Sequence, residues 1–255
     1  MINEENIKLE SFNKNYPSPI SIDTTEKILK QMKECVCRIH CEKKGTGFFT
    51  KIYKRPFLIT NNHVLNKEEI IKNGKIKYSI GQGQDKKFRF INYNQETRKI
   101  YQNKVLDFTI IEIKKEDEID DKNFLEIDDK LKEREEYNNY PIYILGYPNI
   151  EDQEDNVYVS YGIIKNINEK LFHLSSTDDG SSGSPILSLK TCKIIGYHFG
   201  SIINKEINVG SFIEDIQDII FNESKQLFKK ENQRLNKIIM TYRLKLKLKV
   251  KFILV

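Results

Sequence analysis

The stretch TDDGSSGSPI at residues 177–186 holds the residues of this sequence best suited to covalent chemistry. A serine hydroxyl becomes a strong nucleophile only when a neighbouring base takes its proton, and that base needs a partner that holds its tautomer. Backbone N–H groups must also face the developing oxyanion, and glycines let the chain curl into that shape. The amides of Gly180 and Ser182 can supply these donors, and Gly183 leaves space beside the nucleophile. A histidine and a carboxylate must then come from elsewhere in the chain.

Only four histidines can supply the base. His63 follows an apolar run and two asparagines in PFLITNNHVL, which places the imidazole at the end of a strand. His40 and His173 lie within strand-like runs, which favours structural roles for both. His198 lies in IIGYHFGS, in a strand that follows the serine loop. His63 is therefore the predicted base.

The carboxylate is harder to choose, because most of the 37 acidic residues lie in charged runs typical of solvated surface. Asp107 differs, since VLDFTIIEI puts one acid directly before a strongly apolar strand. A half-buried carboxylate there is costly unless a donor pairs with it, and a histidine N–H is such a donor. The simpler alternative is an aspartate that only forms a turn.

Many short strands must position these residues, because alternating apolar runs separated by glycine, asparagine or charged turns extend from residue 35 to about 213. Twelve strands are expected, too many for one small barrel, and two antiparallel six-stranded barrels accommodate them. The expected strands are CVCRIHC, GTGFFTKIY, PFLIT, KIKYSI, KKFRFIN, LDFTIIEI, PIYILGY, VYVSYGII, KLFHLS, SPILSL, KIIGYHF and INVGSFI.

The two ends of the chain differ from this pattern. DTTEKILKQMKE at residues 23–34 predicts a short helix with a threonine cap, and helical periodicity begins at Ile213. The end, RLKLKLKVKFILV, alternates lysine with apolar residues and predicts an amphipathic strand. It is an edge strand or the cut end of a longer chain, with a lipid- or nucleic-acid-binding segment as the alternative. We expect a leader and helix at 1–34, barrels at 35–130 and 131–213, and a helix with a basic tail at 214–255.

Composition excludes several classes of protein. The formal net charge of +5 arises from 42 basic and 37 acidic residues interspersed along the chain, which does not indicate a nucleic-acid partner. No signal peptide and no membrane span are expected, so the predicted location is intracellular and cytoplasmic. The spacing of Cys35, Cys37, His40 and Cys41 matches no common zinc pattern, which favours reduced thiols on a strand over a metal site.

Three segments, GTGFF…LITNNHVL, LDFTIIEI and GSSGSPI, resemble the catalytic blocks of trypsin-like (chymotrypsin-fold) serine peptidases, in that family's order of His, Asp and Ser. The resemblance covers about residues 35–222. It implies an all-β fold of two antiparallel six-stranded Greek-key barrels, with a short N-terminal helix and a C-terminal helix. It also implies His63 as general base, Asp107 as orienting acid, Ser182 as nucleophile, and the amides of Gly180 and Ser182 as oxyanion hole. Ser184 matches a packing position, and at that position it also breaks the glycine-x-serine-x-glycine elbow of α/β-hydrolases.

The sequence is more similar to bacterial glutamyl endopeptidases and high-temperature-requirement proteases than to digestive trypsin, because it carries SGSP after the first serine. In glutamyl endopeptidases a threonine and a histidine at the positions of Thr177 and His198 hold the substrate carboxylate, and Ser201 can add a hydroxyl. Ser176 stands where trypsin has its specificity aspartate, which argues against cleavage after lysine or arginine. The neighbouring acids Asp178 and Asp179 repel a glutamate side chain, so a small-apolar preference stays open beside an acidic one.

The resemblance therefore implies a serine endopeptidase that acts on protein or peptide substrates without metal or cofactor. A catalytically silent fold of the same family, acting as a peptide-binding or regulatory module, is the alternative.

Overall fold

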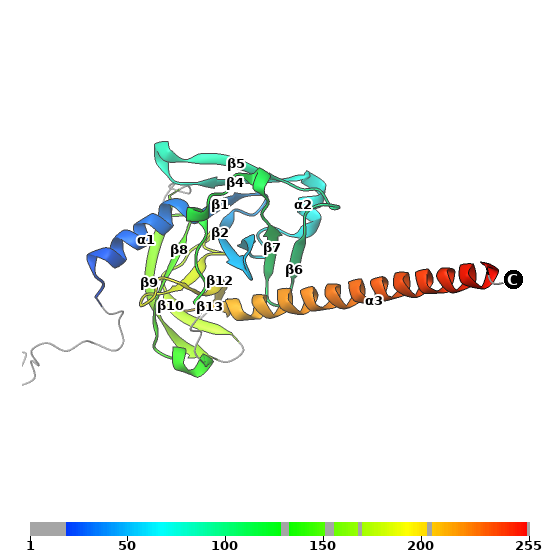
Figure 1. Cartoon of the computed structure of the whole chain (residues 1–255). Coiled ribbons are helices and arrows are strands. Elements are labelled where there is room, and N and C mark those ends of the chain that lie inside the picture. Colours follow the sequence, from blue (N-terminus) through cyan, green and yellow to red (C-terminus); the bar gives the residue numbers. More distant parts are fainter. Residues whose placement is uncertain (1–18, 129–132, 151–155, 168–169, 203–205, 254–255) are drawn as a thin grey trace, which may run out of the picture. The chain divides into compact units, whose positions relative to one another are not determined.

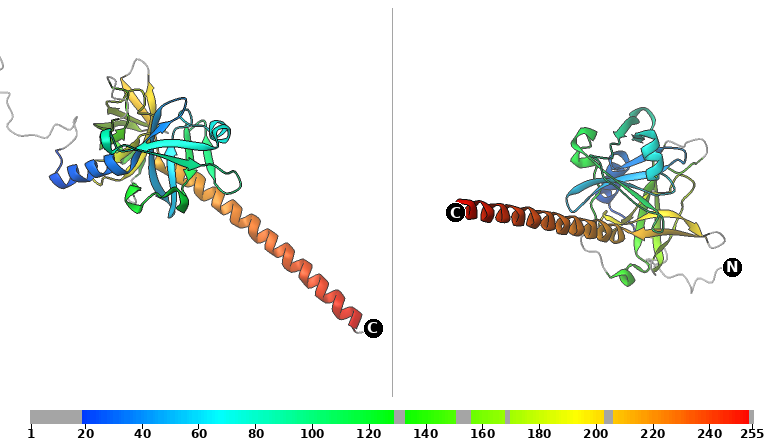
Figure 2. Two further views of the ribbon diagram at one scale, coloured as in Figure 1. Left: turned by 90° about the horizontal axis from the view of Figure 1, so that it is seen from above. Right: turned by 90° about the vertical axis from the view of Figure 1, so that its right-hand side faces the viewer.

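The computed structural model of the chain describes residues 19–128, 133–150, 156–167, 170–202 and 206–253. The chain divides into two compact units, Met1–Ile213 and Glu214–Val255. Most of the leader expected before the first helix lies outside the described residues. The first unit carries two β-sheets (Figures 1 and 2). The helices are α1 (Ile22–Glu34), α2 (Lys67–Asn73) and α3 (Ile213–Ile253), with 3-10 turns η2 (Gly83–Asp85), η3 (Lys115–Asp117), η4 (Asp121–Asn123) and η5 (Arg134–Tyr137).

The first sheet has seven antiparallel strands in the order β5-β4-β1-β2-β3-β7-β6 and forms an open, barrel-like sheet. Six of these strands match the expected runs. The seventh, β6, was missed because it has four residues and only two apolar side chains, and pairing with β7 defines it. The bounds are β1 (Val36–His40), β2 (Gly45–Ile52), β3 (Arg55–Thr60), β4 (Lys75–Ile80), β5 (Lys87–Asn92), β6 (Ile100–Asn103) and β7 (Phe108–Glu112).

The second sheet is a closed six-stranded antiparallel barrel in the order β10-β13-β12-β11-β8-β9, with β9 pairing with β10 to close it. Each of its strands matches an expected run. The bounds are β8 (Pro141–Gly146), β9 (Tyr158–Ile167), β10 (Leu171–Ser175), β11 (Pro185–Ser188), β12 (Ile194–Ile202) and β13 (Ile207–Phe212). The predicted fold class, all-β with two antiparallel barrel-like sheets and helices near both ends, is confirmed. The expectation of six strands in each barrel holds for the second sheet only, because β6 adds a seventh strand to the first sheet, which is open.

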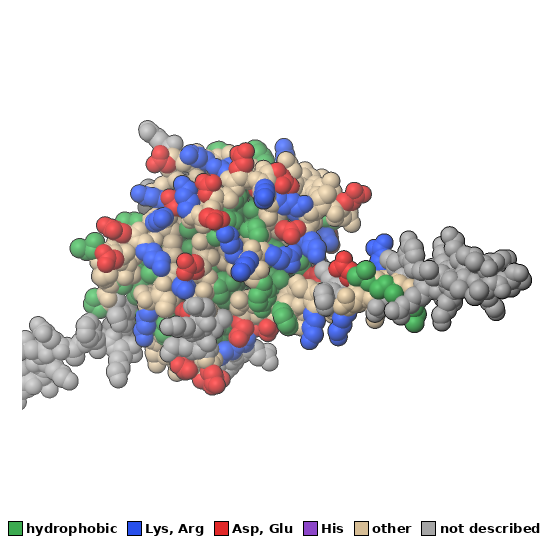
Figure 3. Space-filling model, in the orientation of Figure 1, with side chains coloured by type: hydrophobic (Ala, Val, Ile, Leu, Met, Phe, Trp, Pro, Cys, Tyr) green, Lys and Arg blue, Asp and Glu red, His purple; other side chains and the backbone are tan. Residues whose placement is uncertain are grey.

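Each sheet encloses its own hydrophobic core, which explains why the strands read as apolar alternations. Phe49, Leu58 and Ile111 are fully buried in the first sheet, and Ile144, Ile186 and Phe212 are buried in the second. Burial of large side chains of this kind is worth about 1.5–3 kcal/mol each before opposing terms. Outside these cores the side chains are heavily charged, and Figure 3 shows lysine and arginine interspersed with acidic residues over the face in view.

The helices depart from expectation in three places. The cap of α1 is Ser21, whose hydroxyl accepts the Thr24 amide, so the threonine cap was wrong. Helix α2 was missed, although Asn66 caps its start and Gly74 ends it with a φ of 64°. The amphipathic strand expected at residues 243–255 is also wrong, since α3 continues to Ile253. No proline or glycine interrupts the segment, and its lysines and leucines are good helix formers.

Candidate active site

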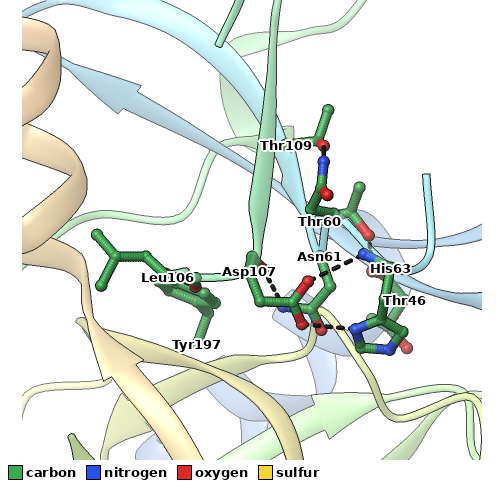
Figure 4. A network of polar contacts seen from close by, with 9 residues as sticks. Thr46, Thr60, Asn61, His63, Leu106, Asp107, Thr109 and Tyr197 are labelled. Atoms are coloured by element: carbon green, nitrogen blue, oxygen red, sulfur yellow. Dashed lines mark hydrogen bonds and ion pairs between the residues drawn. The ribbon is translucent and has the colours of Figure 1, made fainter. Parts of the chain in front are cut away.

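His63 and Asp107 meet where two neighbouring strands of the first sheet, β3 and β7, have adjacent ends. Strand β3 ends three residues before His63, and Asp107 is the residue that precedes β7. Because β3 and β7 pair with Thr60 opposite Thr109, their ends deliver both side chains to the same place. The ring Nδ1 of His63 lies 2.5 Å from Asp107 Oδ2, and the His63 backbone amide donates to Oδ1 at 2.9 Å (Figure 4).

This double contact fixes the chemistry of the imidazole. With Nδ1 donating its proton to the carboxylate, Nε2 is left to accept a proton. The His63 side chain is 39% exposed and the Asp107 side chain 18%, so the pair sits at a rim that a substrate can reach. The structure thus brings together His63 and Asp107, the residues that the sequence suggested as base and acid.

Groups that sequence reasoning missed hold Asp107 in place. Asp107 has a φ of 51°, a left-handed conformation that aspartate tolerates better than most residues. Its carbonyl accepts Asn61 Nδ2 at 2.7 Å, and the carbonyl of Leu106 accepts the hydroxyl of Tyr197 at 2.7 Å. Tyr197 comes from β12 of the second barrel, so this barrel helps to hold the turn that carries the acid (Figure 4).

The serine loop packs against β2 and β3, the strands that lead toward His63. The carbonyl of Ser182 accepts the Thr46 amide at 2.8 Å. Gly183 has a φ of 89°, and a Cβ there would collide with the carbonyl of Thr46 and lie 2.7 Å from the hydroxyl of Thr60. Only glycine fits this approach. The loop is thereby held beside the strand end from which His63 follows.

Among the described residues no hydrogen bond joins the Ser182 hydroxyl to His63, so the structure forms the contact of His63 with Asp107 but no hydrogen bond of His63 with Ser182. Catalytic hydrogen bonds are often long in structures without substrate and tighten when substrate binds. Ser182 itself is half-buried, whereas Ser181 and Ser184 are buried. Of the three serines in this loop, Ser182 is thus the most accessible.

Three backbone amides around Ser182 are occupied by hydrogen bonds within the protein. The amide of Ser181 donates to the carbonyl of Asp178, that of Gly183 to His198, and that of Ser184 to Ser181. Within the described part of the chain, the amides of Gly180 and Ser182 donate to no protein acceptor. Both amides predicted to bind an oxyanion therefore remain available for a ligand.

The residues predicted to set specificity, Thr177, His198 and Ser201, are not joined to one another in the described ranges as His63 and Asp107 are. His198 is 3% exposed, and its Nδ1 lies 3.2 Å from Nε2 of the fully buried His173. Thr177 is half-buried and Ser201 is exposed. No hydrogen bond joins Thr177, His198 and Ser201 where the chain is described. Asn208, which was missed, lies opposite Ser201 on β13 and donates to the carbonyl of Ser175 at 2.6 Å.

The pKa values of both His173 and His198 are lowered. Burial lowers the pKa of His198 to about 4, and the nearby charge of His63 adds to this effect. Burial also holds the pKa of His173 well below its ordinary value, with His198 contributing. Both rings are therefore neutral near pH 7. His173, for which a structural role was expected, thus contacts the ring of His198 through its Nε2 atom.

A cavity of about 290 Å3 adjoins the serine loop. Its lining includes Ile144 and Tyr158 from the barrel and Thr177, Ser181 and Ser184 from the loop. Neither His198 nor Ser201 is among its lining residues, so it is separate from the histidine pair. In the described ranges no group of three or more His, Cys, Asp or Glu side chains is arranged to hold a metal ion.

The fold and the site together define a class: a double-sheet serine peptidase, with the paired His63 and Asp107 on the first sheet and a glycine-flanked serine on the second barrel. A family profile described as "Trypsin-like peptidase domain" matches residues 45–196, more than half of the chain. The chain belongs to this trypsin-like peptidase family, and it is a serine endopeptidase by class.

Solved structures agree with the fold. The serine endoprotease from Yersinia pestis is similar with a TM-score of 0.59 and 14% sequence identity, over 80% of this chain and 67% of that one. Deg5 is similar with a TM-score of 0.54 and 16% identity, over 76% and 90%. An inactive form of Rv3671c from M. tuberculosis H37Rv is similar with a TM-score of 0.56 and 14% identity, over 81% and 95%. No curated protein matches the chain.

No helix in the described ranges has a stretch long and apolar enough to cross a lipid bilayer.

Proposed function

We propose that Ser182, His63 and Asp107 form the catalytic triad of this peptidase. Ser182 attacks the scissile carbonyl while His63 takes its proton, and His63 then returns the proton to the leaving amine. Asp107 holds the imidazole and stabilises its charged form, and the amides of Gly180 and Ser182 bind the oxyanion. Water resolves the acyl-enzyme by the same route. The scheme uses no metal and no cofactor.

The observation that carries this proposal is the paired contact of Asp107 with the ring and the backbone amide of His63. An aspartate that only formed a turn would not need its carboxylate to contact Nδ1 of the imidazole. The amides of Gly180 and Ser182, which have no acceptor in the described part of the chain, give independent support.

Labelling with a serine-directed fluorophosphonate tests the nucleophile. The unaltered protein should be labelled, and Ser182→Ala should not. Ser184→Ala is the matched control, because Ser184 is buried and its hydroxyl has no hydrogen-bond partner among the described residues, so its loss should leave both fold and labelling intact. Absence of labelling in folded protein, or equal labelling of Ser182→Ala, would instead favour a silent peptide-binding module.

We also propose cleavage after acidic residues, with Thr177, His198 and Ser201 receiving the substrate carboxylate. The imidazole of His198 is neutral near pH 7 without a ligand, because burial lowers its pKa to about 4. A substrate carboxylate supplies a counter-ion and favours the protonated ring, which makes charge-assisted hydrogen bonds. The preference should therefore be stronger at pH 5 than at pH 8.

Profiling of cleavage sites on a peptide library tests the specificity. The unaltered protein should cleave after Glu or Asp, and His198→Ala should lose that preference. Cleavage after small apolar residues by both proteins would reject the acidic pocket and leave the triad standing, because the nucleophile is tested separately by labelling.

A further inference from the structure

Arg38 on β1 is a fully buried arginine that the triad does not use. Its Nη1 donates to the carbonyl of Tyr147, and its Nη2 donates to Asn149 Oδ1 at 2.8 Å. A buried guanidinium is costly unless hydrogen bonds compensate for lost water. Arg38 therefore ties the first sheet to the segment of residues 147–149 that follows β8.

That segment in turn holds the peptide before Gly180. The Asn149 amide donates to the carbonyl of Asp179 at 2.6 Å. In a trans peptide the C=O and the following N–H point in opposite directions. Because Asn149 fixes the Asp179 carbonyl on its own side, the N–H of Gly180 must point the other way, and it has no protein acceptor among the described residues.

The peptide after Gly180 is also held by a hydrogen-bond network that includes Tyr147. The carbonyl of Gly180 accepts the hydroxyl of Thr46 at 2.8 Å, and that hydroxyl also accepts the amide of Tyr147 at 3.0 Å. Gly180 itself packs on the guanidinium, since a Cβ at this residue would lie 2.8 Å from Arg38 Nη1. Both peptides that flank Gly180 are thus fixed by groups that Arg38 contacts directly or through Tyr147.

We propose that Arg38 is a positioning residue of the oxyanion hole, which holds residues 147–149 so that the Gly180 amide stays directed at the reacting carbonyl. This inference rests on the proposed function, because it assumes that Gly180 donates to the oxyanion. Arg38 does not touch the substrate. Its effect falls on the transition state, where the oxyanion forms, and not on substrate binding.

Arg38→Met tests the proposal, because methionine keeps an apolar side chain there and removes both donors. Loss of a whole oxyanion donor costs about a hundred- to a thousandfold in turnover, which sets the upper bound. We expect kcat to fall about 10- to 100-fold with KM changed less than about threefold. Affinity for a peptide aldehyde, whose hemiacetal oxygen occupies the hole, should fall by a similar factor. Affinity of Ser182→Ala for uncleaved peptide should be the same with and without the Arg38 change.

Three further variants make the result decisive. Arg38→Lys, which lacks the planar fork that reaches two acceptors, should recover only part of the activity. Asn149→Ala changes an exposed side chain and removes one acceptor of Arg38, so it should lower kcat in the same direction even if Arg38→Met fails to fold. Arg55→Met is the matched control, since Arg55 also bridges two partners, Tyr101 and Glu112, and should leave kcat unchanged.

Unchanged kcat and aldehyde affinity in folded Arg38→Met, or in both Arg38→Lys and Asn149→Ala, would overturn the proposal. An equal loss of kcat in Arg55→Met would also overturn it, because the effect would then be general destabilisation. Failure of the proposed triad would give a different result. Either the unaltered protein would be neither labelled nor active, or Ser182→Ala would still be labelled and active.

Discussion

Asp107→Asn tests the central contact of the site with a change of one atom. Asp107 accepts two donors from the same residue, the His63 backbone N–H at 2.9 Å and the ring Nδ1 at 2.5 Å. An asparagine has one oxygen and one NH2 group. The backbone N–H can only donate, so the oxygen must face it and the NH2 group must face Nδ1. The ring then has to accept at Nδ1 and carry its proton on Nε2, where it cannot take the proton of Ser182.

The expected cost is large because the wrong tautomer removes the general base. Substitution of this kind in a triad costs about 10⁴-fold, which corresponds to about 5 kcal/mol of transition-state stabilisation. The fold should be kept, because the backbone amide of His63 retains its acceptor. The assay is kcat/KM on a fluorogenic peptide, with the midpoint of thermal unfolding measured in parallel.

Two reference variants frame this measurement. Ser182→Ala sets the floor of activity. Asp121→Asn is the control, because its carboxylate is 93% exposed and pairs with Lys51 on the surface, so kcat/KM should not change. A folded Asp107→Asn protein within about tenfold of the unaltered protein would show that Asp107 does not set the tautomer of His63.

Two further predictions concern stability. Burial lowers the pKa of His198 in the folded protein to about 4, below the ordinary value near 6.5. Between these pH values the unfolded chain therefore binds more protons than the folded protein. The contribution of His198 to the free energy of unfolding is then fully present above about pH 6.5 and is lost as the pH falls toward 4. The contribution is about 3 kcal/mol, so urea unfolding of His198→Gln should depend less on pH in this window, and an unaltered dependence would contradict the prediction. Gly183→Ala should lower the free energy of unfolding by about 3 kcal/mol or more, since a left-handed φ and a collision with Thr46 combine. Gly74→Ala, at a similar φ with nothing within 4 Å, should cost only about 1 kcal/mol, and equal losses in the two variants would refute the steric argument.

Local patterns were sufficient for most strands and failed where tertiary contacts define an element. Twelve expected strands are present because each alternates or concentrates apolar residues that a sheet buries. Strand β6 is too short for such a pattern and exists through its pairing with β7. The lysine alternation near the C-terminus matched a strand period, yet the same residues extend a helix that no glycine or proline stops.

The sequence by itself determined the identities of the candidate nucleophile, base and acid, because each lies in a distinctive local setting: a glycine-flanked serine, a histidine after an apolar strand and an acid before one. Only the tertiary structure decided what holds them. Arg38 and Asn149 are 111 residues apart along the chain, and Leu106 and Tyr197 are 91 apart. Such partners leave no periodic or compositional trace, because a hydrogen bond between distant residues depends on how two sheets meet and not on the neighbours of either residue.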